Sequence, residues 1–536
     1  MTELAAKLST LWPEIAVGVA ACVCLATGLA PQPAVRKATV WVAGVGLIVA
    51  GVLVTLGVGV PAEGPPPLWS TTVFVKGATC AVGLLLLLAA AATPALHPQV
   101  AAADARADFE PGDSFRGEFF AFFLLSLMGL MLVSGSNDLV WLFLALELTS
   151  LPTYVMVAIG RPRAAAQEAA VKYFFLGAAA AAVFLYGFTL IYGVSGATVL
   201  LPQAGAGDQL TVQQYVMETY AAGRALPPLF VLGLVLATVG IAFKIAAVPM
   251  HYYAADVYEG ASTPVTAFLA FVPKAAGFTA LIILFSALSW QLPPALVWLL
   301  WIMAAATMTV GNVLGLMQDS VKRVLAYSSI AHSGYMLVGL LAGPAALVVA
   351  EAGAAPTAAP AITDGVAGVL FYLVGYALAT TAAFTVLGCL ARRNGDEAVS
   401  YADLGGLSRR HGPLAAALLI AVLSLIGLPP LVGFLGKLYL FGAAVSRGMV
   451  VLVVIGVLNS AIAAVYYLRI VRACYFDEPR EGVGLLLTPA RLLAAVLAAA
   501  GALTFGVLGG RLADESRLAS PHLPPAVQVH VTSAAP

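Results

Sequence analysis

The chain is dominated by long apolar stretches, and these restrict what it can fold into. Fourteen windows carry few charges, and about 20 apolar residues suffice to cross ~30 Å of hydrocarbon as a helix. Because backbone groups in hydrocarbon must be hydrogen-bonded within the chain, we expect an all-α polytopic membrane protein with about 14 transmembrane helices. The windows are 12–30, 38–60, 72–94, 117–133, 137–159, 168–193, 228–250, 263–288, 294–316, 323–343, 365–391, 413–441, 448–473 and 489–510.

The composition agrees with a membrane protein and excludes several functions. Hydrophobic residues make up 61% of the chain, charged residues 10%, and the mean hydropathy is +0.97, whereas soluble domains carry about 25% charged residues. The net charge is zero and no basic patch occurs, so we expect no nucleic-acid partner. No glycine-rich phosphate motif opens a helix. The five cysteines, Cys22 and Cys24 included, read as small hydrophobic residues and not as metal ligands or disulfides.

The distribution of basic residues predicts the orientation. Of the 26 Lys and Arg residues, sixteen lie in or beside the odd-numbered loops, five lie on the opposite side with the termini, and five lie within helices. Lys and Arg accumulate on the cytoplasmic side of membrane proteins, so we expect both termini to be extracytoplasmic. The N-terminal stretch lacks a basic start and contains Glu14, which favours a retained helix over a cleaved signal peptide.

Two of the predicted helices are broken by proline. Pro249 interrupts the seventh, and Pro429 and Pro430 interrupt the twelfth. These helices are five apart, and because five is odd, a five-helix unit repeated in tandem reverses its direction through the membrane. Inverted repeats with broken helices are a transporter design. We predict four units: 1–116 with helices 1–3 and a loop, 117–288 with the first repeat (helices 4–8), 289–474 with the second repeat (helices 9–13), and 475–536 with helix 14 and an extended tail.

Three lysines lie deep in apolar windows and are the first candidate functional residues. Lys244 and Lys274 flank the break in helix 7, and Lys437 follows the break in helix 12. A lysine in hydrocarbon costs roughly 2.5–3.5 kcal/mol on insertion scales, so it is rarely placed there without a function. A buried lysine that loads and releases a proton would suit proton transport. The alternatives are a structural ion pair for Lys274 and a snorkelling side chain for Lys437.

Glu147 is the expected acidic partner of this set. It lies about nine residues into the fifth predicted helix, near the midplane at a rise of about 1.5 Å per residue. A nearby ammonium would keep it ionised, and Lys244 is the natural partner. The alternative is a neutral carboxyl hydrogen-bonded to Thr149 or Ser150.

Three further residues are weaker candidates. Lys172 follows Glu168 by four residues, so a helix-end ion pair is an alternative to a relay role. His332 lies near the middle of the tenth predicted helix, where a neutral imidazole could link buried sites or be a satisfied core residue. His251 lies at the break in helix 7. Lys76 lies near the outer end of the third helix, so we expect its side chain to extend to the membrane surface and do not count it among the site residues.

Six stretches carry a resemblance to a known family. The sequence resembles the family of subunit N of proton-translocating NADH-quinone oxidoreductase (respiratory complex I), an antiporter-like membrane subunit, over about residues 115–475. The stretches are ELTSLPTYVM (147–156), EAAVKYFFLGA (168–178), FKIAAVPMHYYAADVYEGASTPV (243–265), VPKAAGF (272–278), VKRVLAYSSIAHSGY (321–335) and GLPPLVGFLGKLYLF (427–441).

The resemblance implies a role for each main candidate. Glu147 and Lys244 match the family's coupling pair, Lys274 its central lysine, and Lys437 the lysine toward the outer half-channel. It implies a bacterial plasma-membrane protein that contacts the other antiporter-like and small membrane subunits, the lipid bilayer and, indirectly, the peripheral arm. This chain would hold no cofactor or metal of its own, and flavin, iron–sulfur clusters and quinone would belong to partner subunits.

The loop after helix 7 departs from the family pattern. Met250, Tyr253 and Ala255 replace the usual Phe, Trp and Pro, and Ser262 stands where Pro is common. These departures concern the local loop geometry, because they lie beside the charged residues. Two rival interpretations remain: a subunit of a multi-subunit sodium/proton antiporter or membrane-bound hydrogenase, and a structural scaffold whose buried charges only join helices.

Overall fold

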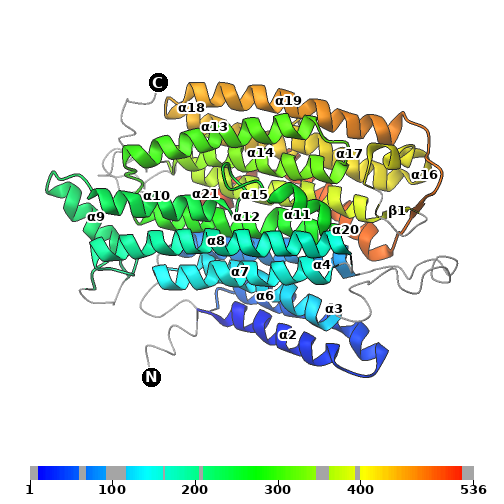
Figure 1. The fold of residues 1–536 in the computed structure, drawn as a ribbon, viewed down its shortest axis with the longest axis horizontal. Helices are drawn as coiled ribbons and strands as arrows, with labels where there is room; N and C mark the ends of the chain where they lie inside the picture. Colours follow the sequence, from blue (N-terminus) through cyan, green and yellow to red (C-terminus); the bar gives the residue numbers. More distant parts are fainter. Residues whose placement is uncertain are drawn as a thin grey trace.

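The computed structural model describes residues 10–58, 68–91, 116–160, 163–203, 209–345, 361–392, 397 and 399–521. Most of these residues form long helices that run side by side along one direction (Figure 1). The long apolar helices are α2 (Trp12–Gly28), α3 (Pro33–Thr55), α4 (Trp69–Ala91), α6 (Arg116–Ser134), α7 (Leu139–Ile159), α8 (Ala164–Ser195), α10 (Pro228–Ala242), α12 (Thr263–Ser286), α13 (Pro294–Leu316), α14 (Val321–Ala342), α15 (Gly365–Gly388), α17 (Gly412–Ile426), α18 (Val432–Ser446), α19 (Val450–Tyr475) and α20 (Pro489–Val507).

Shorter elements lie between and beyond the long helices. Two three-residue strands pair antiparallel, with Leu390 opposite Leu485. The segment between the predicted helices 168–193 and 228–250 contains a helix, and the described start of the tail, which we expected to be extended, is also helical. These elements are α9 (Val212–Ala221), α11 (Ala254–Gly260), α16 (Leu407–Arg410), α21 (Gly510–Leu518), the 3-10 turns Ala361–Thr363 and Tyr401–Leu404, and the strands β1 (Leu390–Arg392) and β2 (Val483–Leu485).

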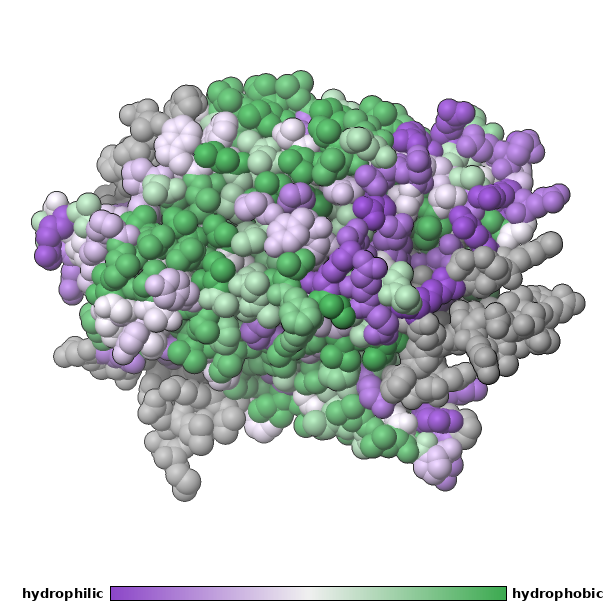
Figure 2. All heavy atoms as spheres, in the orientation of Figure 1, coloured by the Kyte–Doolittle hydropathy of each residue, from purple (hydrophilic) through white to green (hydrophobic). Residues whose placement is uncertain are grey.

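The structure confirms the predicted all-α polytopic class. Eleven helices in the described part of the chain are long and apolar enough to cross a membrane, and α2, α10, α17 and α18 are shorter apolar helices. On the face shown in Figure 2, apolar side chains cover much of the surface, and hydrophilic side chains gather toward the end where α16 and β1 lie. The count of fourteen spans stays a prediction, because α2 and the parts of the two broken helices are each too short to count as full spans.

The centre of the molecule is formed by α12, α14 and α15. In α12 every residue of the most apolar 18-residue window is buried, and in α14 and α15 the buried share is 94%, against 33% in α3 and α19. Helices that are apolar on all sides belong in the interior, whereas peripheral helices turn one apolar face outward. Polar or ionisable groups on the three central helices are therefore held away from lipid and must find partners within the protein.

Polar caps fix where several helices begin. Asp138 accepts hydrogen bonds from the backbone N–H groups of Val140 and Trp141 at the start of α7, at 2.8 and 3.1 Å. Ser320 and Asp364 do the same for α14 and α15. The first N–H groups of a helix have no partner within the helix, so such caps stabilise its start by about 1 kcal/mol. The central helices thus begin at defined positions.

The first proline break is longer than the sequence predicted. Helix α10 ends at Ala242, and turns follow until α11 begins at Ala254. The break was expected at Pro249 but begins after Ala242, so Lys244 lies in the break itself and not in the helix before it. Pro249 has no N–H group to donate to the carbonyl of Ile245, four residues earlier, and its ring would clash there. The break consequently leaves the Ile245 carbonyl available to another donor.

The second break follows the same logic. Helix α17 ends at Ile426, and α18 begins at Val432. Gly427, with φ of +90°, adopts a backbone conformation that residues with a side chain rarely take. Pro429 and Pro430 stand four residues after Leu425 and Ile426, so neither can donate the helical hydrogen bond to those carbonyls. Two further carbonyls are thereby freed in the interior.

Candidate functional site

Glu147 and Lys244 form the ion pair that the sequence predicted. The Lys244 Nζ lies 2.8 Å from the Glu147 Oε1 and also donates to the Ser150 hydroxyl at 2.5 Å. Glu147 comes from α7 and Lys244 from the break after α10. The Lys244 side chain is buried, whereas the Glu147 side chain is 15% exposed. The pair therefore joins a buried lysine to a carboxylate near the outer surface of α7.

Lys274 is fully buried on α12 and is held by neutral groups. Its Nζ donates to the carbonyls of Ile245 and Ser329, both at 2.9 Å, and to the Ser333 hydroxyl at 2.5 Å. These three acceptors match the three N–H groups of an ammonium. No carboxylate of the described residues forms an ion pair with Lys274, so the alternative of a structural ion pair does not fit. One acceptor is the carbonyl that Pro249 leaves free.

A glycine lets the first break approach Lys274. Gly277 lies one turn after Lys274 on α12, and a Cβ added there would lie 2.5 Å from the Ile245 Cγ2. Such a separation is shorter than van der Waals contact, so a larger residue would push the break away from α12. The close packing keeps the Ile245 carbonyl within reach of the Lys274 Nζ.

Lys437 repeats the arrangement at the second break. Its Nζ donates to the carbonyls of Ile426 at 2.8 Å and Leu425 at 3.2 Å, and to the Ser460 hydroxyl at 3.2 Å. The first two are the carbonyls that Pro429 and Pro430 leave free. The nitrogen also lies 4.7 Å from the centre of the Tyr335 ring. Lys437 is 6% exposed, so it does not snorkel to the surface.

His332 lies in the interior on α14, and hydroxyl groups contact both of its ring nitrogens. The Nδ1 is 2.6 Å from the Tyr372 hydroxyl on α15, and the Nε2 is 3.2 Å from the Tyr467 hydroxyl on α19. His332 is 2% exposed. Neither the tyrosines nor the serines around Lys274 were singled out from the sequence as site residues. The available signal was helical spacing, since Ser329, His332 and Ser333 share one face of a single helix.

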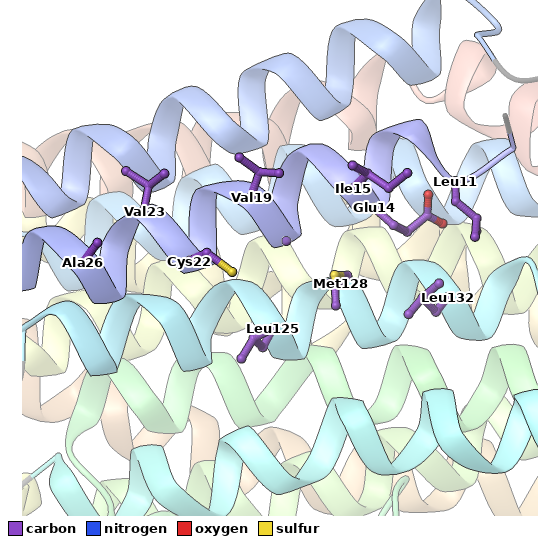
Figure 3. Close-up of a pocket in the computed structure, with 11 residues that line it drawn as sticks. Leu11, Glu14, Ile15, Val19, Cys22, Val23, Ala26, Leu125, Met128 and Leu132 are labelled. Atoms are coloured by element: carbon purple, nitrogen blue, oxygen red, sulfur yellow. The ribbon is translucent and has the colours of Figure 1, made fainter. Parts of the chain in front are cut away.

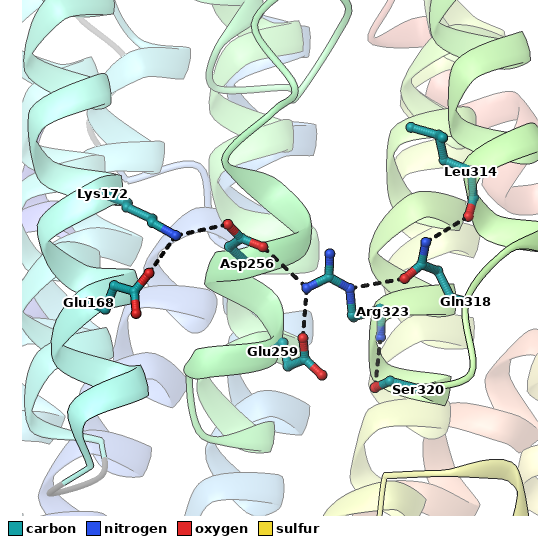
Figure 4. Close-up of polar contacts among 8 residues, drawn as sticks. All are labelled: Glu168, Lys172, Asp256, Glu259, Leu314, Gln318, Ser320 and Arg323. Atoms are coloured by element: carbon teal, nitrogen blue, oxygen red, sulfur yellow. Dashed lines mark hydrogen bonds and ion pairs between the residues drawn. The ribbon is translucent and has the colours of Figure 1, made fainter.

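Lys172 belongs to a polar network apart from the buried lysines (Figure 4). Its Nζ lies 2.6 Å from Glu168 and 3.1 Å from Asp256 on α11. Arg323 on α14 contacts Asp256 at 3.2 Å and Glu259 at 2.7 Å. The predicted ion pair with Glu168 is present, and the two acids of α11 extend it across three helices.

Asp256 is the centre of this network, and its basic neighbours lower the pKa of its carboxyl group. Partial burial alone would raise the pKa of Asp256, but the hydrogen bonds and charges of Lys172 and Arg323 outweigh it and lower the pKa below its ordinary value. The carboxylate form is therefore favoured while α8, α11 and α14 keep these positions.

His251 lies in the break before α11. Among the described residues, no hydrogen bond joins it to Lys244 or Lys274, and its Nδ1 has no partner.

One sequence expectation about the N-terminal helices is wrong. Lys76 on α4 does not snorkel to the surface: its side chain is 5% exposed and lies 2.7 Å from Glu14 on α2, whose side chain is 3% exposed. An ion pair across two helices satisfies the ammonium inside the protein, which removes the need to reach the interface.

Beside Glu14, α2 and α6 form a surface groove of about 610 Å³ that is otherwise apolar, with Leu125, Met128 and Leu132 along α6 (Figure 3).

Comparison with known proteins identifies the family of the chain. Residues 136–463 match the family described as "NADH:quinone oxidoreductase/Mrp antiporter, TM". The chain is similar to NADH-quinone oxidoreductase subunit N of Trichlorobacter lovleyi, with 35% identity over 507 residues and 94% of each protein covered. It is also similar to NADH-quinone oxidoreductase subunit N 1 of Sorangium cellulosum, with 42% identity over 377 residues and 68% of each covered.

Solved structures give the same result. A chain of respiratory complex I from Thermus thermophilus with bound aureothin shares 30% identity and a TM-score of 0.72, and the match covers 94% of this chain and 98% of that one. A chain of the Mrp complex from Dietzia sp. DQ12-45-1b also has a TM-score of 0.72 but only 20% identity, with 98% of each chain covered, so that likeness concerns the fold alone. The chain therefore belongs to the NADH-quinone oxidoreductase subunit N family, within the antiporter-like membrane subunits.

Proposed function

We propose that this chain is a proton-translocating membrane subunit of an NADH-quinone oxidoreductase. Protons pass along its buried Glu, Lys and His side chains, while NADH oxidation and quinone reduction take place in partner subunits that carry the flavin, the iron–sulfur clusters and the quinone. Its place is a bacterial plasma membrane. Both termini face away from the cytoplasm, because Lys and Arg crowd the odd-numbered loops.

The observation that carries the proposal is the way Lys274 and Lys437 are held. Each is buried, and each has neutral acceptors that include carbonyls freed by a proline break. Neither lysine forms an ion pair with a carboxylate of the described residues, and a lysine held in this way fits its site both as an ammonium and as a neutral amine, which still donates two hydrogen bonds. With one such lysine at each break, the chain has two positions at which a proton can be taken up and released. The two breaks also support the division into two repeats, 117–288 and 289–474.

The Glu147–Lys244 pair is the proposed point at which the driving force acts. Glu147 is partly exposed on α7, between the exposed apolar side chains of Leu144 and Leu151. Such a face suits a neighbouring membrane subunit, whose change in charge next to Glu147 would alter the attraction to Lys244. We propose Lys172 and His251 only as secondary proton-transfer residues, and His332 as the link between the buried lysines.

Purification of the intact complex tests the proposal. The chain should co-purify with flavin- and iron–sulfur-containing subunits, and the preparation should reduce quinone with NADH and acidify one side of sealed vesicles. A sodium/proton antiporter assembly without NADH-quinone activity would contradict the proposal. The relatives named for subunit N favour the oxidoreductase over that alternative, since the likeness to the Mrp complex extends only to the fold. A scaffold role would instead predict that substitution of the lysines abolishes assembly before pumping.

A further inference from the structure

The imidazole of His332 sits between two tyrosine hydroxyl groups. The Tyr372 hydroxyl lies 2.6 Å from Nδ1, and the Tyr467 hydroxyl lies 3.2 Å from Nε2. All three side chains are buried. A neutral imidazole has one N–H donor and one lone-pair acceptor, so one tyrosine accepts a hydrogen bond from the ring while the other donates one. This arrangement gives the ring a proton-transfer partner on each side.

The two hydroxyls lie on different sides of His332. The Tyr467 hydroxyl also contacts the Ser328 hydroxyl, one turn before His332 on α14. The Tyr372 ring packs on Gly436, the neighbour of Lys437, so closely that a Cβ at Gly436 would clash with the Tyr372 Cδ2. The Tyr372 ring therefore packs against the helix of Lys437, and the Tyr467 hydroxyl lies beside Ser328, one turn nearer the start of α14.

His332 also shares neighbours with both buried lysines. Lys274 bonds to Ser329 and Ser333, which lie on the same face of α14 as His332. On the other side, the Lys437 Nζ lies 4.7 Å from the centre of the Tyr335 ring, and that centre lies 5.6 Å from the centre of the His332 ring. A connection between the two lysines through His332 needs groups that bridge to the ring, and in the described structure the ring nitrogens contact Tyr372 and Tyr467 alone.

We propose that Tyr467 and Tyr372 carry protons to and from His332, which makes them two further proton-transfer residues. This inference rests on the proposed function. Tyr467 passes its hydroxyl proton to Nε2 and regains one from its other neighbour, while Nδ1 releases its proton to the Tyr372 oxygen, whose own proton moves on toward Lys437. One proton crosses, both hydroxyls are restored, and the imidazole ends as the other tautomer. Reversal of the tautomer resets the ring for the next proton.

Three Tyr→Phe variants of the intact complex test the inference. Tyr467→Phe and Tyr372→Phe each remove one hydroxyl oxygen and keep the ring, whereas Tyr376→Phe is the matched control. The Tyr376 ring centre lies 5.1 Å from that of His332, but its hydroxyl does not bond to the imidazole. NADH-driven proton uptake into sealed vesicles is measured per assembled complex, in H₂O and in D₂O. We expect uptake to fall about fivefold or more in the first two variants, because a buried hydrogen-bond partner is lost, and to stay near wild type in the control.

The isotope comparison separates proton transfer from mere positioning of the ring. When a bridging hydroxyl is removed, proton transfer across the gap becomes the slow step, so the ratio of uptake in H₂O to that in D₂O should rise. An unchanged ratio with reduced uptake would mean that the hydroxyls only hold the imidazole, and would overturn the inference. Gly436→Ala keeps both hydroxyls but displaces the Tyr372 ring, and should resemble Tyr372→Phe.

Lys274→Ala, assayed beside these variants, distinguishes the inference from the proposed function. If Lys274→Ala stops uptake while Tyr467→Phe and Tyr372→Phe pump as wild type, the function stands and the tyrosine route is wrong. If Lys274→Ala itself pumps as wild type, the proposed function is wrong, and the tyrosine route is overturned with it.

Discussion

Glu147→Gln is the substitution whose effect follows most directly from the geometry. It keeps the size of the side chain and removes its charge. At 2.8 Å between Nζ and Oε1, the attraction between Glu147 and Lys244 is about 6 kcal/mol at an effective dielectric constant of about 20. The amide keeps one hydrogen bond and the side chain is 15% exposed, so the net loss is about 3 kcal/mol. That loss shifts the balance between charged and neutral Lys244 about a hundredfold.

A shift of this size should uncouple the subunit without unfolding it. We expect Glu147→Gln to assemble normally and to show clearly reduced NADH-driven proton uptake in sealed vesicles, normalised to assembled complex. The control is Glu218→Gln, the same change at an exposed position on α9, which should pump as wild type. Normal pumping by Glu147→Gln would refute the coupling role of the pair.

Three further outcomes are expected. Lys437→Ala should lower proton uptake with normal assembly, whereas Lys172→Arg should be milder because Lys172 is 42% exposed in a surface ion-pair network; equal losses in vesicle assays would contradict this difference. Asp256→Asn should lower the melting temperature at neutral pH. The pKa of Asp256 is lowered in the folded protein. The carboxylate therefore stabilises the fold above the ordinary aspartate pKa of about 3.9, and this stabilisation is lost as the pH falls through the pKa of the folded state. The melting temperatures of variant and wild type should consequently converge in acid. Glu14→Gln leaves the buried ammonium of Lys76 without its counter-charge, at a cost of about 3–5 kcal/mol; it should lower the melting temperature but leave pumping per assembled complex unchanged.

The sequence was sufficient to predict the fold class and the pairing of Glu147 with Lys244. Hydropathy alone predicts the spans, and a lysine in an apolar window is conspicuous because hydrocarbon disfavours it. The pair of Glu147 and Lys244 followed because each needs a counter-charge near the midplane. The prediction that Lys76 reaches the surface was wrong, because nothing in the sequence indicates that α2 brings Glu14 beside it.

The groups that hold the lysines could not be predicted from residue types. Lys274 and Lys437 bond to backbone carbonyls, which every residue carries, and only the packed structure shows which carbonyls the prolines leave free at the right place. The tyrosines at His332 come from two other helices and look like ordinary apolar-face residues in the sequence. The first break was also longer than Pro249 alone suggested, which placed Lys244 outside the helix.

The most direct test of the central claim compares Lys274→Arg with Lys274→Ala. Arginine keeps the charge but does not release its proton at any accessible pH, so a lysine that exchanges protons cannot be replaced by it. The measurement is NADH-driven proton uptake in sealed vesicles, normalised to assembled complex, together with the coupled NADH-quinone rate. We predict that both variants assemble and that both lose uptake and coupled turnover. If Lys274→Arg equals wild type while Lys274→Ala fails to assemble, Lys274 is a structural charge and the proton path does not pass through it.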